Sequence, residues 1–345
     1  MQHTKAWASR AVVGALTAAA VLGTIGSATA QGVVNVYTNR EPGLYSATLA
    51  EFTKATGIKV NALFSEQGLA ERIKAEGENS PADVLITVDI GRLQEAVDLG
   101  IAEPTRSEVL AANIPAQYRD PDGLWFALSL RARTVYASRE RVKEDSLAYE
   151  DLADPKWKGK ICTRSFQHQY NIALVAAMIV KNGEARTEEW LRGVKANLAK
   201  KPSGGDRDVA KDIAAGACDI GLGNQYYVGL MTNGSAEQKK WAEAIRVILP
   251  RFQKGGTHIN VSGAIVAKHA PNRNNASKLL EFMTTNDAQR VFADVNFEYP
   301  VRPGVPVNPL VASFGPLQAD PMAVADIAKA RGKASELVDK VAFDR

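Results

Sequence analysis

Short strands rich in β-branched residues alternate with helical segments along this chain, and this alternation restricts its fold more than any other feature. Gly57 and Gly100 stand where two of the helical patterns stop. Strands that alternate with helices at this spacing form a parallel sheet covered by helices on both faces. The first hundred residues therefore predict an α/β unit, with strands at 33–37, 58–64 and 81–88 and helices at 44–56, 67–76 and 91–99.

A second α/β unit follows the extended stretch at 125–138, whose length suits a crossing between two lobes. A further stretch at 258–267 is expected to carry the chain back. Two α/β lobes joined by a two-segment hinge form a clamp that holds a ligand between the lobes, at the strand ends. The other predicted elements are strands at 160–163 and 217–224, helices at 172–181, 187–200, 206–215, 275–284 and 323–341, and a proline-rich connector at 300–309.

The first thirty residues have the pattern of an export signal. Lys5 and Arg10 carry the only charges, an apolar run follows at 11–25, and Ala28-Thr29-Ala30 fits an A-x-A cleavage site. The run is too short and too rich in Ala and Gly for a membrane span. We therefore expect cleavage after Ala30 and a periplasmic mature protein.

The mature chain would be large enough for two lobes, because removing 30 of 345 residues leaves 315. We expect an N-terminal lobe at 31–129 plus 257–300 and a C-terminal lobe at 130–256 plus 301–345. The net charge of +4 falls to +2 without the leader, and basic residues are scattered rather than arranged in stripes with aromatic residues. This pattern does not indicate nucleic-acid binding, and we expect a monomer.

Cys162 and Cys218 are the two cysteines of the chain. In an exported protein they are a candidate disulfide, with two buried free thiols as the alternative. Each cysteine precedes a tyrosine by eight residues, Tyr170 and Tyr226 respectively. A bridge, which we favour, would tie two neighbouring strands and fix the two tyrosine-bearing turns relative to each other.

The Tyr226-Tyr227 pair follows a strand of small residues at 217–224. A phenol has a pKa of about 10, so it becomes a metal ligand only for a cation that displaces its proton, as Fe(III) does. Strand neighbours point to opposite faces, whereas the first turn of a helix or a loop can aim both phenols at one point. The alternative is a pair of half-buried packing residues with hydrated hydroxyls.

An ordered set of short segments resembles the periplasmic ferric-ion-binding proteins of ABC-type iron(III) importers. The resemblance covers nearly the whole mature chain and implies the type II-like fold of periplasmic binding proteins. The segments are Val-Asn-Val-Tyr-Thr-Asn-Arg-Glu at 34–41, Pro-Ala-Asp-Val-Leu-Ile-Thr-Val-Asp at 81–89, Arg-Ser-Phe-Gln-His-Gln-Tyr-Asn at 164–171, Asn-Gln-Tyr-Tyr at 224–227, Gly-Thr-His-Ile-Asn-Val-Ser-Gly at 256–263 and Tyr-Pro-Val-Arg-Pro-Gly-Val at 299–305.

The resemblance implies that Tyr226 and Tyr227 bind Fe(III) as phenolates, with Tyr170 as the third ligand of a three-tyrosine branch. The alternative for Tyr170 is an aromatic residue packed at a helix start. Glu41 stands where many relatives have a histidine, and a carboxylate oxygen is as hard a ligand as a phenolate. Glu41 would otherwise be a surface carboxylate at a helix start. Tyr45 is an outside candidate, and Val88 stands where another branch has a glutamate.

Arg40 and Arg131 are candidates for balancing the charge of the site. Three phenolates neutralise Fe(III), so a fourth anionic ligand would leave the site negative. A guanidinium can offset that charge or hold a synergistic carbonate or another small anion, which the family often uses. Arg133 is expected instead to form a structural ion pair.

The resemblance implies capture of Fe(III) between the lobes and delivery to an ABC permease in the inner membrane. The alternatives are the same clamp binding an organic anion or a polyamine, or an exported α/β enzyme. The chain has no Gly-x-Ser-x-Gly elbow and no His-Glu-x-x-His motif. Its four histidines lack zinc-ligand spacing. We therefore predict a binding protein and not an enzyme.

Overall fold

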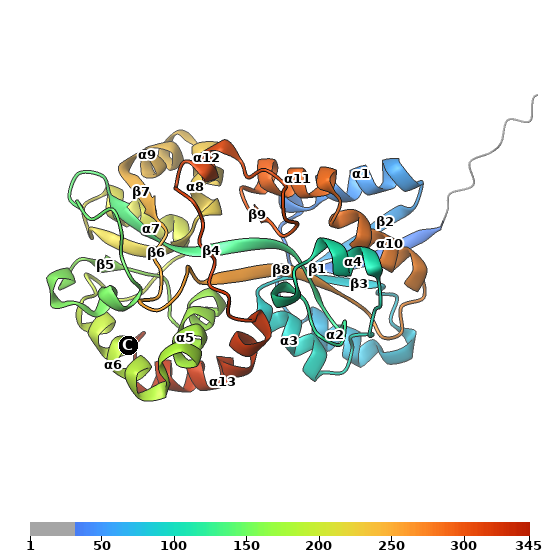
Figure 1. The fold of residues 1–345 in the computed structure, drawn as a ribbon, viewed down its shortest axis with the longest axis horizontal. Helices are drawn as coiled ribbons and strands as arrows, with labels where there is room; N and C mark the ends of the chain where they lie inside the picture. Colours follow the sequence, from blue (N-terminus) through green and yellow to red (C-terminus); the bar gives the residue numbers. More distant parts are fainter. Residues whose placement is uncertain (1–31) are drawn as a thin grey trace, which may run out of the picture.

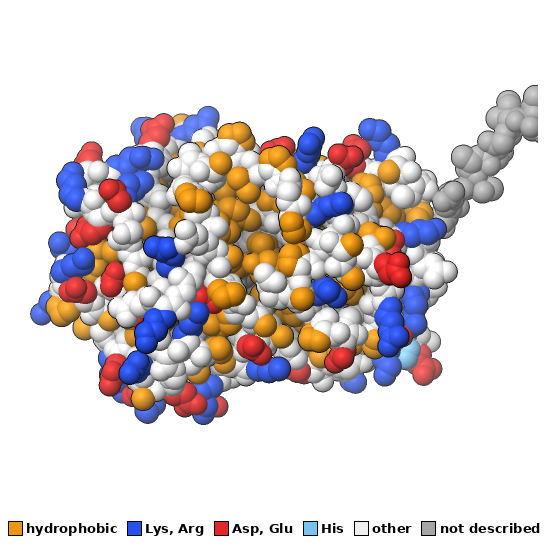
Figure 2. Space-filling view, in the orientation of Figure 1, with side chains coloured by type: hydrophobic (Ala, Val, Ile, Leu, Met, Phe, Trp, Pro, Cys, Tyr) orange, Lys and Arg blue, Asp and Glu red, His pale blue; other side chains and the backbone are white. Residues whose placement is uncertain are grey.

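Residues 32–345 are described in the computed structural model, so the predicted leader at 1–30 lies outside them. The chain forms two halves, each a sheet with helices around it, and two long strands run across between them (Figure 1). Over the described residues, no helix combines the length and apolar character needed to cross a membrane. Charged side chains of both signs are scattered over the visible face, and apolar ones gather near its middle (Figure 2).

The N-terminal half is built on the parallel strands β2, β1 and β3, followed by the antiparallel strand β8. β3 reads Val-Leu-Ile-Thr-Val and is buried along nearly its whole length, as expected for a strand with helices on both faces. α1, α3 and α10 contact these strands. The strands of this half are β1 (Val33–Thr38), β2 (Lys59–Phe64), β3 (Val84–Val88) and β8 (Ile259–Val266).

The other half is built around β6, which pairs with β5 in parallel and with β4 antiparallel. β7 pairs with the same end of β4. The small residues of β6 allow close approach, since a Cβ on Gly223 would collide with the ring of Tyr136. The strands are β4 (Phe126–Ser138), β5 (Ile161–Cys162), β6 (Ile220–Asn224) and β7 (Ile245–Ile248). A short strand, β9 (Tyr299–Pro300), pairs with residues 129–130 of β4, in the sheet of the N-terminal half.

β4 joins the two halves because it belongs to both sheets. Its thirteen residues are all buried. Pairing with β8 runs from residue 126 to residue 132, and pairing with β6 runs from residue 133 to residue 137. The predicted α/β fold with mixed sheets is confirmed, and β4 and β8 occupy the two predicted crossings.

The predicted helices are present, and the structure adds several that the sequence pattern did not reveal, including α4, α9 and α11. α13 packs along α5 and also contacts α3 of the other half (Figure 1). The longer helices are α1 (Ser46–Thr56), α2 (Leu69–Glu76), α3 (Ile90–Asp98), α5 (Gln169–Asn182), α6 (Glu184–Ala196), α7 (Asp206–Ala214), α9 (Ala236–Ala244), α10 (Arg273–Met283), α11 (Asn286–Asn296) and α13 (Val324–Lys340). The shorter ones are α4 (Glu108–Asn113), α8 (Tyr226–Thr232), α12 (Pro309–Ala312) and the 3-10 helices η1 (Pro42–Leu44), η2 (Gly77–Asn79), η3 (Ala116–Tyr118), η4 (Glu150–Ala153) and η5 (Pro155–Trp157).

Cys162 and Cys218 form a disulfide, which confirms the predicted pairing. Cys162 ends β5, and Cys218 lies just before β6, the parallel neighbour of β5. The bridge closes a loop of 56 positions, and constraining such a loop in the unfolded chain contributes roughly 4 kcal/mol of stability in the chain-entropy treatment. The closed loop contains Tyr170 and ends near Tyr226.

Candidate metal centre

Tyr226 and Tyr227 open helix α8, directly after β6. Gln225 fixes this start: its amide oxygen accepts from the Ala132 backbone N–H at 2.9 Å, and its amide nitrogen donates to the Phe297 carbonyl at 3.1 Å. The rings of Tyr226 and Tyr227 lie 4.2 Å apart, centroid to centroid, with 32° between their planes. The first turn of a helix therefore presents both phenols side by side, as the sequence allowed.

Tyr170 joins this pair from the first turn of another helix, α5. Its hydroxyl lies 3.4 Å from the hydroxyl of Tyr226. His168 caps α5, because its Nδ1 accepts from the Tyr170 backbone N–H at 3.2 Å. Tyr170 is 7% exposed and Tyr226 is 4% exposed. The structure thus brings the three predicted tyrosines together in one cluster, in which Tyr227 is half-buried.

Four guanidinium groups surround the three rings. Arg131 lies 5.5 Å from the ring centroid of Tyr170 and 5.9 Å from that of Tyr226, and its Nη1 donates to the Tyr170 hydroxyl at 3.4 Å. Arg164 and Arg133 lie 5.4 and 6.0 Å from the Tyr170 centroid, and Arg207 lies 4.8 Å from that of Tyr227. Positive charge at these distances favours phenolate over phenol.

Burial of the phenols shifts their pKa in the opposite direction to the arginine charges. Burial, and then the neighbouring tyrosines, raise the pKa of Tyr226 well above its usual value, although Arg131 lowers it. Burial and then Tyr170 likewise raise the pKa of Tyr227. Burial alone would lower the pKa of Arg131, but Tyr170, Tyr226 and Glu298 raise it overall. Both phenols of the pair therefore stay protonated at neutral pH until a strong cation displaces their protons.

Arg133 forms a buried ion pair with Asp206, as predicted for a structural residue. Arg133 Nη1 lies 2.6 Å from Asp206 Oδ2, and Arg164 Nη1 lies 3.4 Å from Asp206 Oδ1. The pKa of Asp206 is raised by burial but lowered overall by Arg133 and Arg164, so its carboxyl stays ionised. Asp206 Oδ2 also accepts from the Asn224 backbone N–H at 2.9 Å. This pair therefore supports the end of β6 from which Tyr226 follows.

Arg40 and Arg131 both pair with the carboxylate of Glu298, a residue that sequence reasoning missed. Glu298 Oε2 lies 3.0 Å from Arg40 Nη2, and Glu298 Oε1 lies 4.0 Å from Arg131 Nε. Ser129 Oγ donates to the same carboxylate at 2.7 Å. Glu298 stands one position before the Tyr-Pro-Val-Arg-Pro-Gly-Val segment at 299–305, and nothing in its sequence context distinguishes it from a surface carboxylate.

Both arginines keep unused hydrogen-bond donors. Arg40 Nε and Nη1 and Arg131 Nε are buried, and none has a hydrogen-bond partner among residues 32–345. Unpaired buried donors are uncommon in proteins and commonly mark a place for water or an anion. The same two side chains were predicted from the sequence to balance charge or hold an anion.

Glu41 lies apart from these contacts. It is exposed at the start of η1, and none of the side-chain hydrogen bonds or ion pairs found over residues 32–345 involves it. Tyr45 is 6% exposed, and burial raises its pKa. Val88 ends β3.

The histidines near the hinge are neutral side chains. Burial, and then the charge of Arg164, lower the pKa of His168 to about 3. Burial, and then Arg133, lower the pKa of His258 to about 3. Within the described chain, no group of three or more His, Cys, Asp or Glu side chains could hold a metal ion.

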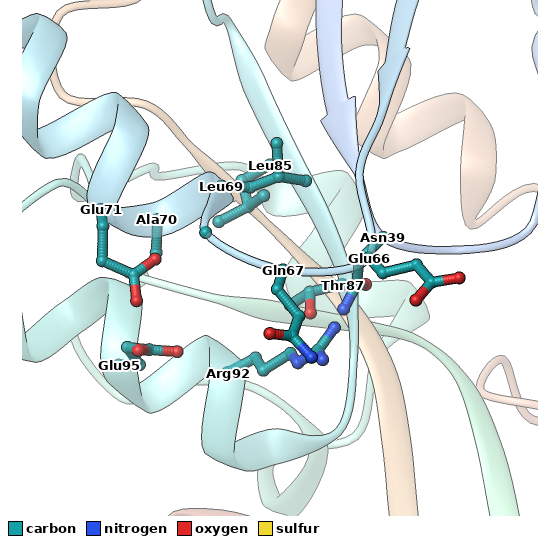
Figure 3. Close-up of a pocket in the computed structure, with 11 residues that line it drawn as sticks. Asn39, Glu66, Gln67, Leu69, Ala70, Glu71, Leu85, Thr87, Arg92 and Glu95 are labelled. Atoms are coloured by element: carbon teal, nitrogen blue, oxygen red, sulfur yellow. The ribbon is translucent and has the colours of Figure 1, made fainter.

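A cavity of about 220 Å³ opens in the N-terminal half, between Thr87 at the end of β3 and the start of α2 (Figure 3). Glu71 and Glu95 face each other at one side, and Arg92 lies beside Gln67. Burial, and then the charge of Glu71, raise the pKa of Glu95. None of the three tyrosines lines this cavity.

Arg207 and Asn171 are two further residues at the site that sequence reasoning missed. Arg207 lies over Tyr227, and Asn171 Oδ1 accepts from Arg133 Nε at 3.1 Å and from Arg133 Nη2 at 2.7 Å. Asn171 directly follows Tyr170 in a segment that carried the resemblance, which was the only available signal. Arg207 sits in a charged Asp-Arg-Asp run that reads as an ordinary helix start.

The chain is similar to a family of known proteins. The family described as bacterial extracellular solute-binding protein matches residues 79–319. Iron uptake protein A1 of Synechocystis sp. is 42% identical over 316 residues, which cover 91% of this chain and 88% of that protein. The major ferric iron-binding protein of Neisseria meningitidis is 31% identical over 280 residues, which cover 79% of this chain and 82% of that protein.

The fold of this chain is also similar to that of solved structures. The Bordetella ferric binding protein matches with a TM-score of 0.86 and 56% identity, over 91% of this chain and 100% of that chain. The Trichodesmium protein IdiA (FutA), solved in complex with iron and citrate ligands, matches with a TM-score of 0.87 and 41% identity, over 90% of this chain and 100% of that chain.

Fold and site together define a two-lobed α/β binding protein. The chain belongs to the bacterial extracellular solute-binding proteins. The resemblance seen in the sequence motifs is confirmed, because the relatives are themselves named as iron uptake and ferric iron-binding proteins.

Proposed function

We propose that this protein binds Fe(III) through Tyr170, Tyr226 and Tyr227. The observation that carries the proposal is the cluster of three tyrosines, two buried and one half-buried, among four guanidinium groups, with the hydroxyls of Tyr170 and Tyr226 3.4 Å apart. Phenolate oxygen is a hard ligand that suits a hard trivalent cation. Three phenolates neutralise the ion, and the arginines stabilise the ligands in their charged form.

The names of the relatives support iron as the cargo. Four of them are named for iron uptake, ferric iron binding, ferric binding, or a complex with iron and citrate. None of these names describes an enzyme, which agrees with the prediction that this chain is a binding protein. The organic anion and polyamine alternatives find no comparable support.

A fourth ligand to iron would be either the Glu41 carboxylate or a small anion. Glu41 is exposed in the structure, so its ligation would require the two halves to close on each other. The unpaired donors of Arg40 and Arg131 support a synergistic carbonate or another small anion held between the lobes. The Trichodesmium protein, solved in complex with iron and citrate ligands, fits such a role for an anion.

The proposed cellular role is delivery of iron to an ABC permease in the inner membrane. Family membership supports a solute-binding role in transport, with the permease as partner. We further propose a periplasmic location after cleavage at Ala30, a monomeric state, and lobes that divide at 31–129 plus 257–300 and 130–256 plus 301–345.

The test is the visible spectrum of the purified protein after addition of ferric citrate, with and without bicarbonate. We expect a red-to-purple tyrosinate charge-transfer band in the wild type and its loss or shift in Tyr226→Phe and Tyr227→Phe. Removing a ligand should lower iron affinity by at least about 100-fold, because loss of a supporting residue alone costs 10 to 100-fold.

The matched control is Tyr118→Phe, which changes a buried tyrosine of η3 outside the cluster. The control should keep both the band and the affinity of the wild type. A colourless wild-type protein in the presence of iron, or an unchanged band in both cluster variants, would overturn the proposed function.

A further inference from the structure

Asp89 is held in a costly backbone conformation at the end of β3. Its φ is 85° and its ψ is 131°, and it is a non-glycine residue with a fully buried side chain. Positive φ at such a residue persists only where surrounding contacts enforce it, and such positions gather at functional sites. Asp89 closes the segment at 81–89 that carried part of the family resemblance, yet the iron site as proposed does not use it.

Arg331 of α13, a helix packed mainly against α5, forms an ion pair with Asp89. Its Nη1 lies 2.9 Å from Asp89 Oδ1, and the same nitrogen donates to the Gln169 backbone carbonyl at 3.3 Å. Gln169 is the first residue of α5, and Tyr170 follows it. One guanidinium thus joins the end of β3 to the turn that carries a tyrosine of the cluster.

The contact is tightly fitted. A Cβ atom placed on Gly91 would lie 2.1 Å from both Cζ and Nε of Arg331, so only glycine leaves room for the guanidinium. Gly91 also donates its backbone N–H to Asp89 Oδ1 at 2.7 Å. α13, α3 and α5 all contact one another at this place (Figure 1). The absence of a side chain at Gly91 therefore leaves space for the Arg331 guanidinium in this position.

Asp89 is tied to the arginine that touches the tyrosines. Its backbone N–H donates to the Val261 carbonyl at 2.8 Å, and Arg131 Nη2 donates to that same carbonyl at 2.6 Å. Asn260 Nδ2 donates to Asp89 Oδ2 at 2.6 Å. The two routes from Asp89, through Arg331 to Gln169 and through Val261 to Arg131, both end at Tyr170.

We propose that Arg331 is a positioning residue for the tyrosine cluster: it fastens the first turn of α5, and therefore Tyr170, to Asp89 at the end of β3. This inference rests on the proposed role of the tyrosines in iron binding. Arg331 does not touch the metal; it acts by holding one ligand in place, so its effect on iron binding passes through Tyr170.

A double-mutant cycle tests this dependence, with iron affinity measured by competition against citrate. Arg331→Met should lower the affinity by roughly 10 to 100-fold, the range found for residues that orient metal ligands. In a Tyr170→Phe background the same substitution should change affinity by less than about twofold, because the ligand it positions is absent. The charge-transfer band of Arg331→Met should shift toward that of Tyr170→Phe.

Asp89→Asn is the second variant, since Asn keeps an oxygen for the helix cap and tolerates positive φ but loses the ion pair. If Arg331→Met fails to fold, Asp89→Asn should show the loss of iron affinity and the band shift that are expected of Arg331→Met. Lys329→Met is the matched control, because Lys329 is an exposed cation on the same helix. The control should leave affinity and band unchanged.

Equal losses of affinity in the two backgrounds, or no loss in either, would overturn the proposal while leaving the iron site intact. A loss of thermal stability with an unchanged band and affinity would do the same, because a purely structural residue behaves in that way. Wild-type protein that gives no tyrosinate band with iron would overturn both this proposal and the proposed function.

Discussion

The two sides of the candidate iron site are organised very differently. On the tyrosine side, Tyr170 and Tyr226 are buried, their helix starts are fixed by hydrogen bonds, and a disulfide joins the strands that lead to them. On the opposite side, Glu41 is exposed and lies outside the side-chain contacts found over residues 32–345. Under the proposed function, the tyrosine side is a half-site assembled before iron arrives, and the opposite side contributes only on binding.

The largest expected effect tests how rigid the tyrosine side is. Asp206→Asn leaves Arg133 and Arg164 without their buried carboxylate, and breaking such a pair typically costs about 3 to 5 kcal/mol. We expect a loss of this size in the free energy of unfolding, measured in urea.

The matched control for Asp206→Asn lies on the opposite side of the molecule. Lys54→Met in α1 removes an exposed ion pair with Glu51, which should contribute at most about 1 kcal/mol. Similar losses in the two variants would contradict the contrast between a rigid and a loosely held side.

An effect of intermediate size is expected in the pH dependence of iron binding. Burial, and then the neighbouring Tyr170, raise the pKa of Tyr226 and Tyr227, so both phenols carry protons near neutral pH. Iron must displace these protons, so its affinity should fall by at least about 100-fold for each unit by which the pH is lowered, since at least two protons are released.

Proton release can be counted directly in weakly buffered solution as iron is added near pH 7. We expect at least two protons per iron in the wild type and one fewer in Tyr227→Phe. An unchanged count in Tyr227→Phe would mean that this tyrosine does not enter the site as a phenolate.

The smallest expected effect lies at Glu41. Because Glu41 is exposed and not held by contacts, Glu41→Gln should change iron affinity by less than about tenfold, against at least about 100-fold for Tyr226→Phe. Competition titrations against citrate measure both. Equal losses would mean that the N-terminal side contributes a ligand as strong as the tyrosines.

Much of the tyrosine cluster could be predicted from the sequence because its residue types are chemically distinctive. A tyrosine pair after a strand of small residues, with cysteines at matching offsets, predicted a pair of linked turns, and the disulfide at Cys162 and Cys218 confirmed the link. The α/β alternation predicted the two sheets and both crossings, because buried parallel strands need continuous apolar runs.

The remaining features depend on contacts between distant segments, which local patterns do not encode. Glu298 lies between Arg40 and Arg131 although 258 positions separate it from Arg40. Arg331 reads as a surface cation in a charged helix, yet it pairs with the buried Asp89. α11 was missed because it follows α10 after a break of only two residues.

The position of β8 beside the shared strand β4 affects the order in which the protein can fold. β8 lies between β3 and β4 in the sheet, but it leaves the ribosome long after them, and 171 positions separate Asp89 from its partner Asn260. The edges of β3 and β4 that β8 will cover stay unpaired until that late segment arrives. The first half of the chain is therefore expected to remain incompletely folded while the rest is synthesised, a state that suits a polypeptide awaiting passage across a membrane.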